Sequence, residues 1–177
     1  MIGIAGYFLV QGALIELVRD ARDGRVDRGI ADTYRAVVPR LPALVAAGVV
    51  AAIAIGIGLI LLVIPGLFLL TIWSMLAAVI VIEGRSAGES FGRSQDVVRG
   101  HGWTVFWLLV VTFLIVGIAE QLIHLVFAPL PDFLDSWLGS LVAHSLTVPF
   151  AVAALTTAYF KLTSARAEAT PTPAPAA

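Results

Sequence analysis

The chain has 177 residues, of which 59% are hydrophobic and 13% charged, and its formal net charge is -1. Soluble domains carry about 45–50% apolar and about 25% charged residues, so this composition indicates a membrane protein in a single domain. The near-neutral charge argues against a nucleic-acid partner, and the absence of cysteine excludes disulfides, thiol nucleophiles and thiolate metal ligands.

The first predicted element is a short apolar segment at 2–18. It is apolar apart from Gln11 and Glu16, and it lacks both the basic start and the A-x-A site of a signal peptide. We therefore expect a retained, short membrane span. Glu16 leaves only about 14 strongly apolar residues where roughly 17 is the usual lower limit, so a clipped or interfacial segment is the alternative.

Two amphipathic helices are predicted on the cytoplasmic membrane face. Segment 19–40 holds six arginines and four aspartates, which suits a helix lying on a membrane surface. Its apolar positions recur at helical spacing: Val26, Ile30, Tyr34, Val37, Val38 and Leu41. The second helix is predicted within 83–102, where Ser86 and Glu89 have the spacing of a capping box, and glycines end it before Trp103.

Between them, 41–82 contains no charged residue, and 43–63 consists only of Ala, Val, Ile, Leu and Gly. A span needs about 20 apolar residues to cross roughly 30 Å of hydrocarbon at 1.5 Å rise per residue. Segment 43–63 meets this length and 67–82 nearly does. The intervening Ile64-Pro65-Gly66 predicts a tight hairpin, because Pro65 lacks an amide hydrogen and Gly66 tolerates positive φ.

A ridge of small residues on the first half of this hairpin predicts close helix packing. Gly48, Ala52 and Gly56 have small-xxx-small spacing, which lets two helix backbones approach. Packing inside the protein is favoured over a dimer interface.

Two more spans are predicted at 103–127 and 138–160. The tail after them is rich in Pro, Ala and Thr without an apolar pattern, which predicts disorder. The domain prediction is therefore a transmembrane helical domain at 1–164 and a disordered cytoplasmic tail at 165–177.

The eleven basic residues sort into three segments: six lie in 19–40, three in 83–102 and two after 160. Cytoplasmic loops of membrane proteins carry an excess of Lys and Arg. We therefore predict an all-α, polytopic transmembrane helix bundle of about five spans, with the amino terminus outside and the carboxyl terminus cytoplasmic. The high Ala, Val and Gly content favours a bacterial protein, and hence the cytoplasmic (inner) membrane.

A set of short motifs resembles the bacterial membrane-domain family named after glycerophosphoryl diester phosphodiesterase. The motifs are Ile64-Pro65-Gly66, Trp73, Glu83-Gly84, Ser90, Arg93-Ser94, Arg99-Gly100-His101, Trp103, Pro149-Phe150, Thr156 and Tyr159. The likeness covers most of 10–166. It implies a helical membrane domain without activity of its own, since the catalytic residues of that family's enzymes belong to a separate domain. It also implies six spans, so a first span would be missing before Met1.

An intramembrane polar cluster is the candidate site for chemistry. Glu120 and His124 lie at i and i+4 on one helix face with Gln121 adjacent, and His144 falls at a comparable depth on the last span. Structural or interfacial pairing is the favoured interpretation. A proton relay and a metal site of two His and one carboxylate are the sharper alternatives.

A basic cytoplasmic face is the candidate lipid-headgroup contact, through Arg93, Arg99 and His101. The general excess of basic residues on the cytoplasmic side of membrane proteins is the alternative, and it accounts for the same residues.

No G-x-S-x-G, H-E-x-x-H or phosphate-cradling glycine loop is present. We therefore expect a non-enzymatic integral membrane protein without a cofactor or metal, acting through membrane lipids, other membrane proteins or a second copy of itself. A small-solute or lipid transporter, or a subunit of one, is the alternative. An intramembrane metal-dependent enzyme is the weaker third.

Overall fold

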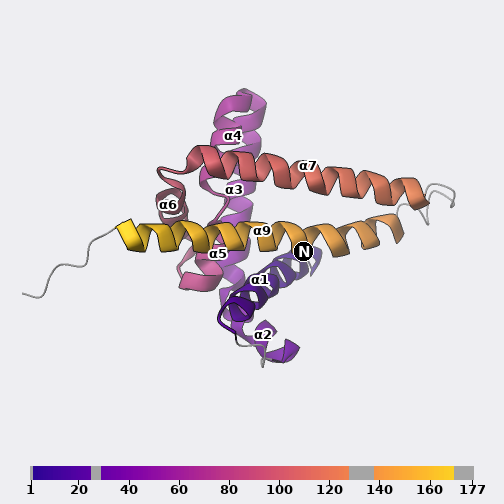
Figure 1. Ribbon diagram of the computed structural model, residues 1–177, viewed down its shortest axis with the longest axis horizontal. Coiled ribbons are helices and arrows are strands. Elements are labelled where there is room, and N and C mark those ends of the chain that lie inside the picture. Colours follow the sequence, from indigo (N-terminus) through magenta and orange to yellow (C-terminus); the bar gives the residue numbers. More distant parts are fainter. Residues whose placement is uncertain (1, 25–28, 128–137, 170–177) are drawn as a thin grey trace, which may run out of the picture.

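A computed structural model describes residues 2–24, 29–127 and 138–169, and every element in these ranges is helical (Figure 1). The elements are α1 Ile2–Arg22, α2 Ile30–Val37, the 3-10 turn η1 Val38–Arg40, α3 Leu41–Leu61, α4 Val63–Ile72, α5 Leu76–Ala78, the π-helical η2 Val79–Glu83, α6 Ala87–Val98, α7 Gly102–Phe127 and α9 Ser140–Ala169. The all-α prediction is confirmed for the described residues.

Four helical stretches of the described chain are long and apolar enough to cross a membrane. They are Ala31–Leu61, Val63–Glu83, Gly102–Phe127 and Ser140–Arg166. The prediction of membrane-spanning helices is confirmed to this extent. The fifth span, predicted at 2–18 and contained in α1, is not among the four and stays a prediction.

The helices form two crossed hairpins. Figure 1 shows α7 and α9 side by side and running in opposite directions, with α3 and α4 crossing them. The helix α1 packs against α9, α2 and α3, and α6 contacts α3, α4 and α9. The first and last described helices are therefore in direct contact.

The turn between α3 and α4 lies earlier than the predicted 64–66. The helix breaks at Leu62, whose backbone is extended (φ -157°, ψ 124°). Pro65 lies in the first turn of α4, where backbone N–H groups have no intrahelical partner, so the missing amide hydrogen costs nothing.

Gly66 has a packing role rather than the predicted turn role. It is buried, and a Cβ at this position would lie 2.6 Å from the backbone N of Leu59. Gly58 faces it, because a Cβ there would lie 3.0 Å from the Cα of Gly66. This glycine pair lets α3 and α4 come together at the hairpin end.

The predicted ridge of Gly48, Ala52 and Gly56 is not a continuous contact. Gly48 packs directly against the ring of Phe8 on α1. Ala52 is exposed, and a Cβ at Gly56 would meet nothing within 4 Å. The close contact of this helix face is therefore confined to Gly48.

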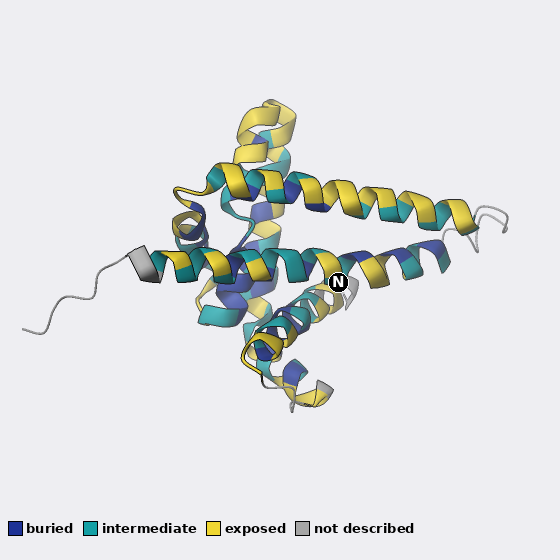
Figure 2. Ribbon diagram, in the orientation of Figure 1, coloured by how far each residue is buried: buried dark blue, intermediate teal, exposed yellow. Residues whose placement is uncertain are grey.

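The core centres on α5 and η2. Met75, Val79 and Val81 are fully buried, and this segment supplies residues to two apolar clusters. One cluster contains Met75, Ala78, Val79, Val97, Val98, Val105, Leu109 and Tyr159, and the other contains Ile15, Val37, Leu44, Ala47, Ile80, Val81 and Val152. Figure 2 shows that exposed residues gather instead on α7 and at the free end of the α3–α4 hairpin.

The two predicted amphipathic helices turn their apolar sides toward the protein. On α6, Val97 and Val98 are buried in the core, and the buried Ser94 hydroxyl donates to the Ile72 carbonyl oxygen at 2.8 Å. The helix α2 is shorter than predicted, and it buries Thr33 and Val37. Val26 lies outside the described residues. The placement of either helix on a membrane surface stays a prediction.

The predicted capping box at the start of α6 is confirmed. The Ser86 hydroxyl accepts from the Glu89 backbone N–H, and the Glu89 carboxylate accepts from the Ser86 backbone N–H at 3.1 Å. The hydrogen bonds from the Ser86 side chain and then from its backbone lower the pKa of Glu89 below its ordinary value of 4.5. The charged carboxylate is therefore the form that holds the first turn of α6.

This lowered pKa predicts an acid-sensitive contribution to stability. A depressed folded-state pKa stabilises the protein above the unfolded-state pKa, and the contribution disappears as pH falls through the folded-state value. We expect Glu89→Ala to unfold at a lower temperature than the wild type at neutral pH, with the difference closing as the pH falls below the ordinary pKa of 4.5 and through the lowered folded-state value. Thermal unfolding in detergent across this range measures it, with Gln95→Ala on the same helix as control. A difference that is constant with pH would contradict the prediction.

The carboxyl-terminal helix continues past both of its predicted limits. The helix α9 runs through Ala169, beyond the predicted end of the span at 160 and the predicted start of the disordered tail at 165. Residues 165–169 are thus helical, which corrects the tail prediction there. The rest of the tail lies outside the described residues.

Candidate functional site

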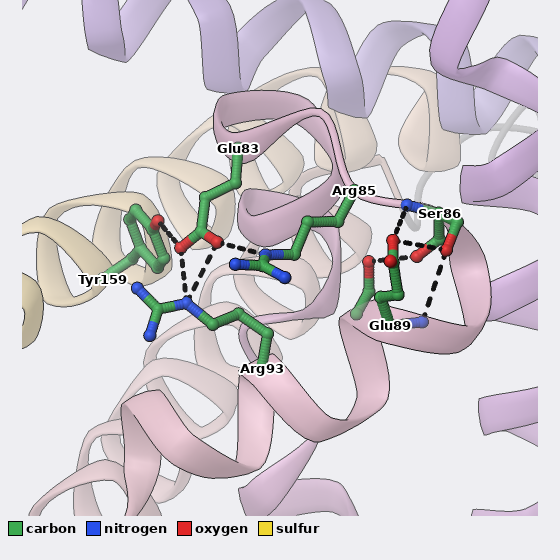
Figure 3. Close-up of polar contacts among 7 residues, drawn as sticks. Glu83, Arg85, Ser86, Glu89, Arg93 and Tyr159 are labelled. Carbon is green, nitrogen blue, oxygen red and sulfur yellow. Dashed lines mark hydrogen bonds and ion pairs between the residues drawn. The ribbon is translucent and has the colours of Figure 1, made fainter.

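A network of ionic hydrogen bonds joins three segments at the end of η2 (Figure 3). Gly84, in left-handed geometry (φ 68°), ends this helix immediately after Glu83. The Glu83 Oε1 atom accepts from the Tyr159 hydroxyl at 2.6 Å and from Arg93 Nε at 2.8 Å. The Oε2 atom accepts from Arg85 Nε at 2.8 Å and from Arg93 Nε at 3.0 Å.

Both oxygens of the Glu83 carboxylate are occupied by these donors. Charge-assisted hydrogen bonds are roughly twice as strong as neutral ones, and two guanidinium groups balance the single negative charge. A carboxylate held in this way is a poor proton acceptor for a substrate. The arrangement instead clamps η2, α6 and α9 together at one point.

A second carboxylate, which unlike Glu83 is fully buried, ties α1 to the start of α3. Glu16 is 1% exposed, and its Oε1 atom accepts from Arg40 Nη1 at 2.6 Å. Arg19 lies 3.6 Å from the other oxygen. A buried charge is tolerated only when it is paired, so these arginines allow Glu16 to sit inside the bundle.

Further contacts bring the three basic segments together. Arg22 donates to the Ser164 hydroxyl at 3.3 Å and lies 4.3 Å from the centre of the Phe160 ring. Arg166 donates to the backbone carbonyl of Arg99 at 2.7 Å. Basic residues from 19–40, from 83–102 and from the end of α9 therefore meet in one region of the molecule.

The predicted polar cluster is only partly assembled. Glu120 on α7 accepts from the Thr147 hydroxyl on α9 at 3.3 Å, and the same hydroxyl donates to the Ala143 carbonyl of its own helix at 2.9 Å. His144 is exposed and bonds through Nδ1 to the Ser140 carbonyl of its own helix at 2.8 Å. Gln121 is exposed and His124 is half-buried. Within the described ranges, no three His, Asp or Glu side chains are grouped as a metal site would require.

The predicted headgroup contacts differ in their surroundings. Arg93 is held by both oxygens of Glu83, whereas Arg99 and His101 are exposed. Lipid contact by these three residues stays a prediction.

The sequence analysis named most of the residues in these contacts but did not predict which of them contact one another. Glu83 is the first charged residue after the uncharged run at 41–82, and this position marks it as a candidate for a specific role. Its partner Tyr159 is 76 positions away, and no spacing rule joins the two. Thr147 was missed because a single threonine in an apolar helix has no distinguishing pattern.

The fold and these contacts define a class of protein: over the described residues it is all-helical, and its long apolar helices are joined by ion pairs of Glu16 and Glu83. The family model described as Domain of unknown function (DUF7847) matches residues 2–165, and the chain belongs to this family. No curated protein and no solved structure matches the chain. The family match does not link the chain to the glycerophosphoryl diester phosphodiesterase membrane domain, and that resemblance stays a prediction.

Proposed function

We propose that the protein is a non-enzymatic, multi-pass integral protein of the bacterial cytoplasmic membrane that acts through lipids or membrane partners. The observation that carries the proposal is the large apolar surface of the long helices. Ile60 is 86% exposed, Ile64 78% and Val126 74%. Soluble proteins rarely leave contiguous apolar patches of this kind uncovered. Lipid is the medium that covers such side chains on helices of spanning length.

The meeting of the basic segments supports the predicted orientation. Contacts of Arg22 with Ser164 and of Arg166 with the Arg99 carbonyl join them directly. Segments in contact lie on the same side of a membrane, and the basic side is the cytoplasmic one. The proposal therefore places 19–40, 83–102 and the end of α9 in the cytoplasm and the connector at 129–136 outside.

The arginine partners of Glu16 and Glu83 favour a binding or scaffolding role over catalysis. Each carboxylate is paired with arginine and hydrogen-bonded within the protein, so its charge is engaged in internal contacts and not presented to a substrate. The transporter alternative requires Glu120, His124 and His144 around a polar cavity, whereas Glu120 bonds Thr147 and His144 faces its own helix. These contacts give the transporter less support.

The absence of native cysteine makes the topology directly testable. Single cysteines are introduced at Ala31, Gln95 and Ala165 on the proposed cytoplasmic side, and at Ser136 in the proposed outer connector. A membrane-impermeant maleimide applied to intact cells is expected to label only Ser136→Cys, and to label the other three after lysis. Labelling of Ala31→Cys and Gln95→Cys from opposite sides would overturn the proposal.

A further inference from the structure

A cleft between α1 and α9 lies where the basic segments meet. Its volume is about 690 Å³, and its lining contains two cations, two hydroxyls and four apolar residues: Arg22, Lys161, Thr157, Ser164, Val18, Ala21, Phe160 and Ala165. None of these lining residues is acidic. The walls are therefore apolar and the charged groups carry one sign.

A second groove, between α7 and α9, continues from this cleft. Its volume is about 400 Å³, and it shares Thr157 and Lys161 with the first. The remaining lining is apolar and largely small, with Ala153, Ala154 and Ala158 between the larger Leu108 and Phe150. Because small side chains leave room above a helix, the groove follows α9 from Phe150 to Lys161.

The length of this groove matches one leaflet of a bilayer. Lys161 lies eleven positions after Phe150, which corresponds to ~16 Å along a helix. Half of the hydrocarbon core measures ~15 Å. A chain lying in the groove would thus reach from the cationic cleft to near the middle of the membrane.

Lys161 is the exposed cation at the junction of the two clefts. Within the described part of the chain its ammonium group has neither a hydrogen bond nor an ion pair. Arg22, across the cleft, is held over Phe160 and near Ser164. Ammonium and guanidinium groups are the usual partners of phosphate, and a lysine at the end of a membrane helix extends toward the headgroup layer.

We infer that the two clefts form one binding site for an anionic phospholipid. One acyl chain lies along the groove on α9, and the headgroup phosphate is bound by Lys161 and Arg22. This inference rests on the proposed function, because it requires α9 to lie in a membrane. It gives the basic face one specific lipid contact, at residues different from Arg93, Arg99 and His101.

The test is a lipid titration of the purified full-length protein in detergent, followed by native mass spectrometry. Phosphatidylglycerol and phosphatidylcholine are compared, since they differ in headgroup charge and share their acyl chains. A basic residue near the membrane surface contributes about 1 kcal/mol of attraction to anionic lipid. Lys161→Gln is therefore expected to weaken phosphatidylglycerol binding by about fivefold. It should weaken phosphatidylcholine binding less, because the choline cation of that lipid offsets the charge of its phosphate.

Ala154→Leu tests the groove independently, because it fills the apolar part without altering charge. It is expected to weaken both lipids by the same factor. Arg35→Gln is the matched control: it also removes one positive charge, from an 81% exposed side chain on α2 paired with Asp32, and should change neither lipid.

Equal phosphatidylglycerol binding by the wild type and Lys161→Gln would overturn the inference. So would competition by inorganic phosphate together with full binding by Ala154→Leu, which would indicate a free-phosphate site. The proposed function is tested separately, by the cysteine labelling described above. Correct topology with unchanged lipid binding would remove the lipid site alone.

Discussion

Gly66→Ala is expected to lower the free energy of unfolding by about 3 kcal/mol, the upper end of the usual cost of overpacking. The new Cβ would lie 2.6 Å from the backbone N and 2.5 Å from the Cγ of Leu59. Side chains can move away from such a clash, but the backbone of α3 can do so only if the hairpin opens. The substitution therefore acts on the packing of α3 against α4 and not on the turn at Leu62.

The measurement is thermal unfolding in detergent, followed by tryptophan fluorescence and by monodispersity on size exclusion. Gly56→Ala is the matched control on the same hairpin, because its Cβ would meet nothing within 4 Å. It should leave stability unchanged or raise it slightly, since alanine is the better helix former. Equal effects of the two substitutions would show that Gly66 does not mark a close helix contact.

Glu83→Ala is expected to lower the free energy of unfolding by about 2 kcal/mol, within the range for loss of hydrogen bonds to a charged group. The Glu83 side chain is 17% exposed, so its ion pairs are only partly buried. The substitution leaves the buried Tyr159 hydroxyl without its acceptor, and it leaves Arg85 and Arg93 close together without their shared anion. Water reaches both arginines, whose side chains are 44% and 34% exposed. Solvation therefore offsets part of the loss.

A double-mutant cycle separates this clamp from simple loss of packing. Tyr159→Phe keeps the ring and removes one hydrogen bond, which should cost about 1 kcal/mol. In the Glu83→Ala background the same change should cost much less, because the acceptor is already gone. Additive effects, measured by the same thermal unfolding, would mean that the hydroxyl and carboxylate are not coupled.

The sequence predicted what depends on local chemistry. The capping box needs only the spacing of Ser86 and Glu89, and α7 begins at Gly102, one residue before its predicted start. The length of α7 follows equally from the uninterrupted apolar composition of 103–127. These features need no knowledge of the rest of the chain.

The sequence could not predict features that depend on which surfaces meet. The break at Leu62 carries no polar signal, and Pro65 is compatible with both a turn and the first turn of a helix. Gly48 and Gly56 look equivalent in sequence, and only the ring of Phe8 distinguishes them. The predicted partnership of Glu120 with His144 assumed a rotation of α9 that instead presents Thr147.

The π-helical geometry of η2 has a consequence for how the chain can vary. A π-bulge accommodates one residue more than an α-helix of the same length, so residues beyond it are rotated by ~100° relative to an uninterrupted helix. In η2 this rotation falls between the fully buried Val79 and the carboxylate of Glu83. Loss of a single residue from the bulge would convert it to an ordinary α-helical turn and leave that carboxylate on the side of Tyr159, because the bulge is what accommodates the extra residue. A single deletion at 79–82 should therefore be better tolerated than a single insertion, which would rotate Glu83 by ~100° away from Tyr159.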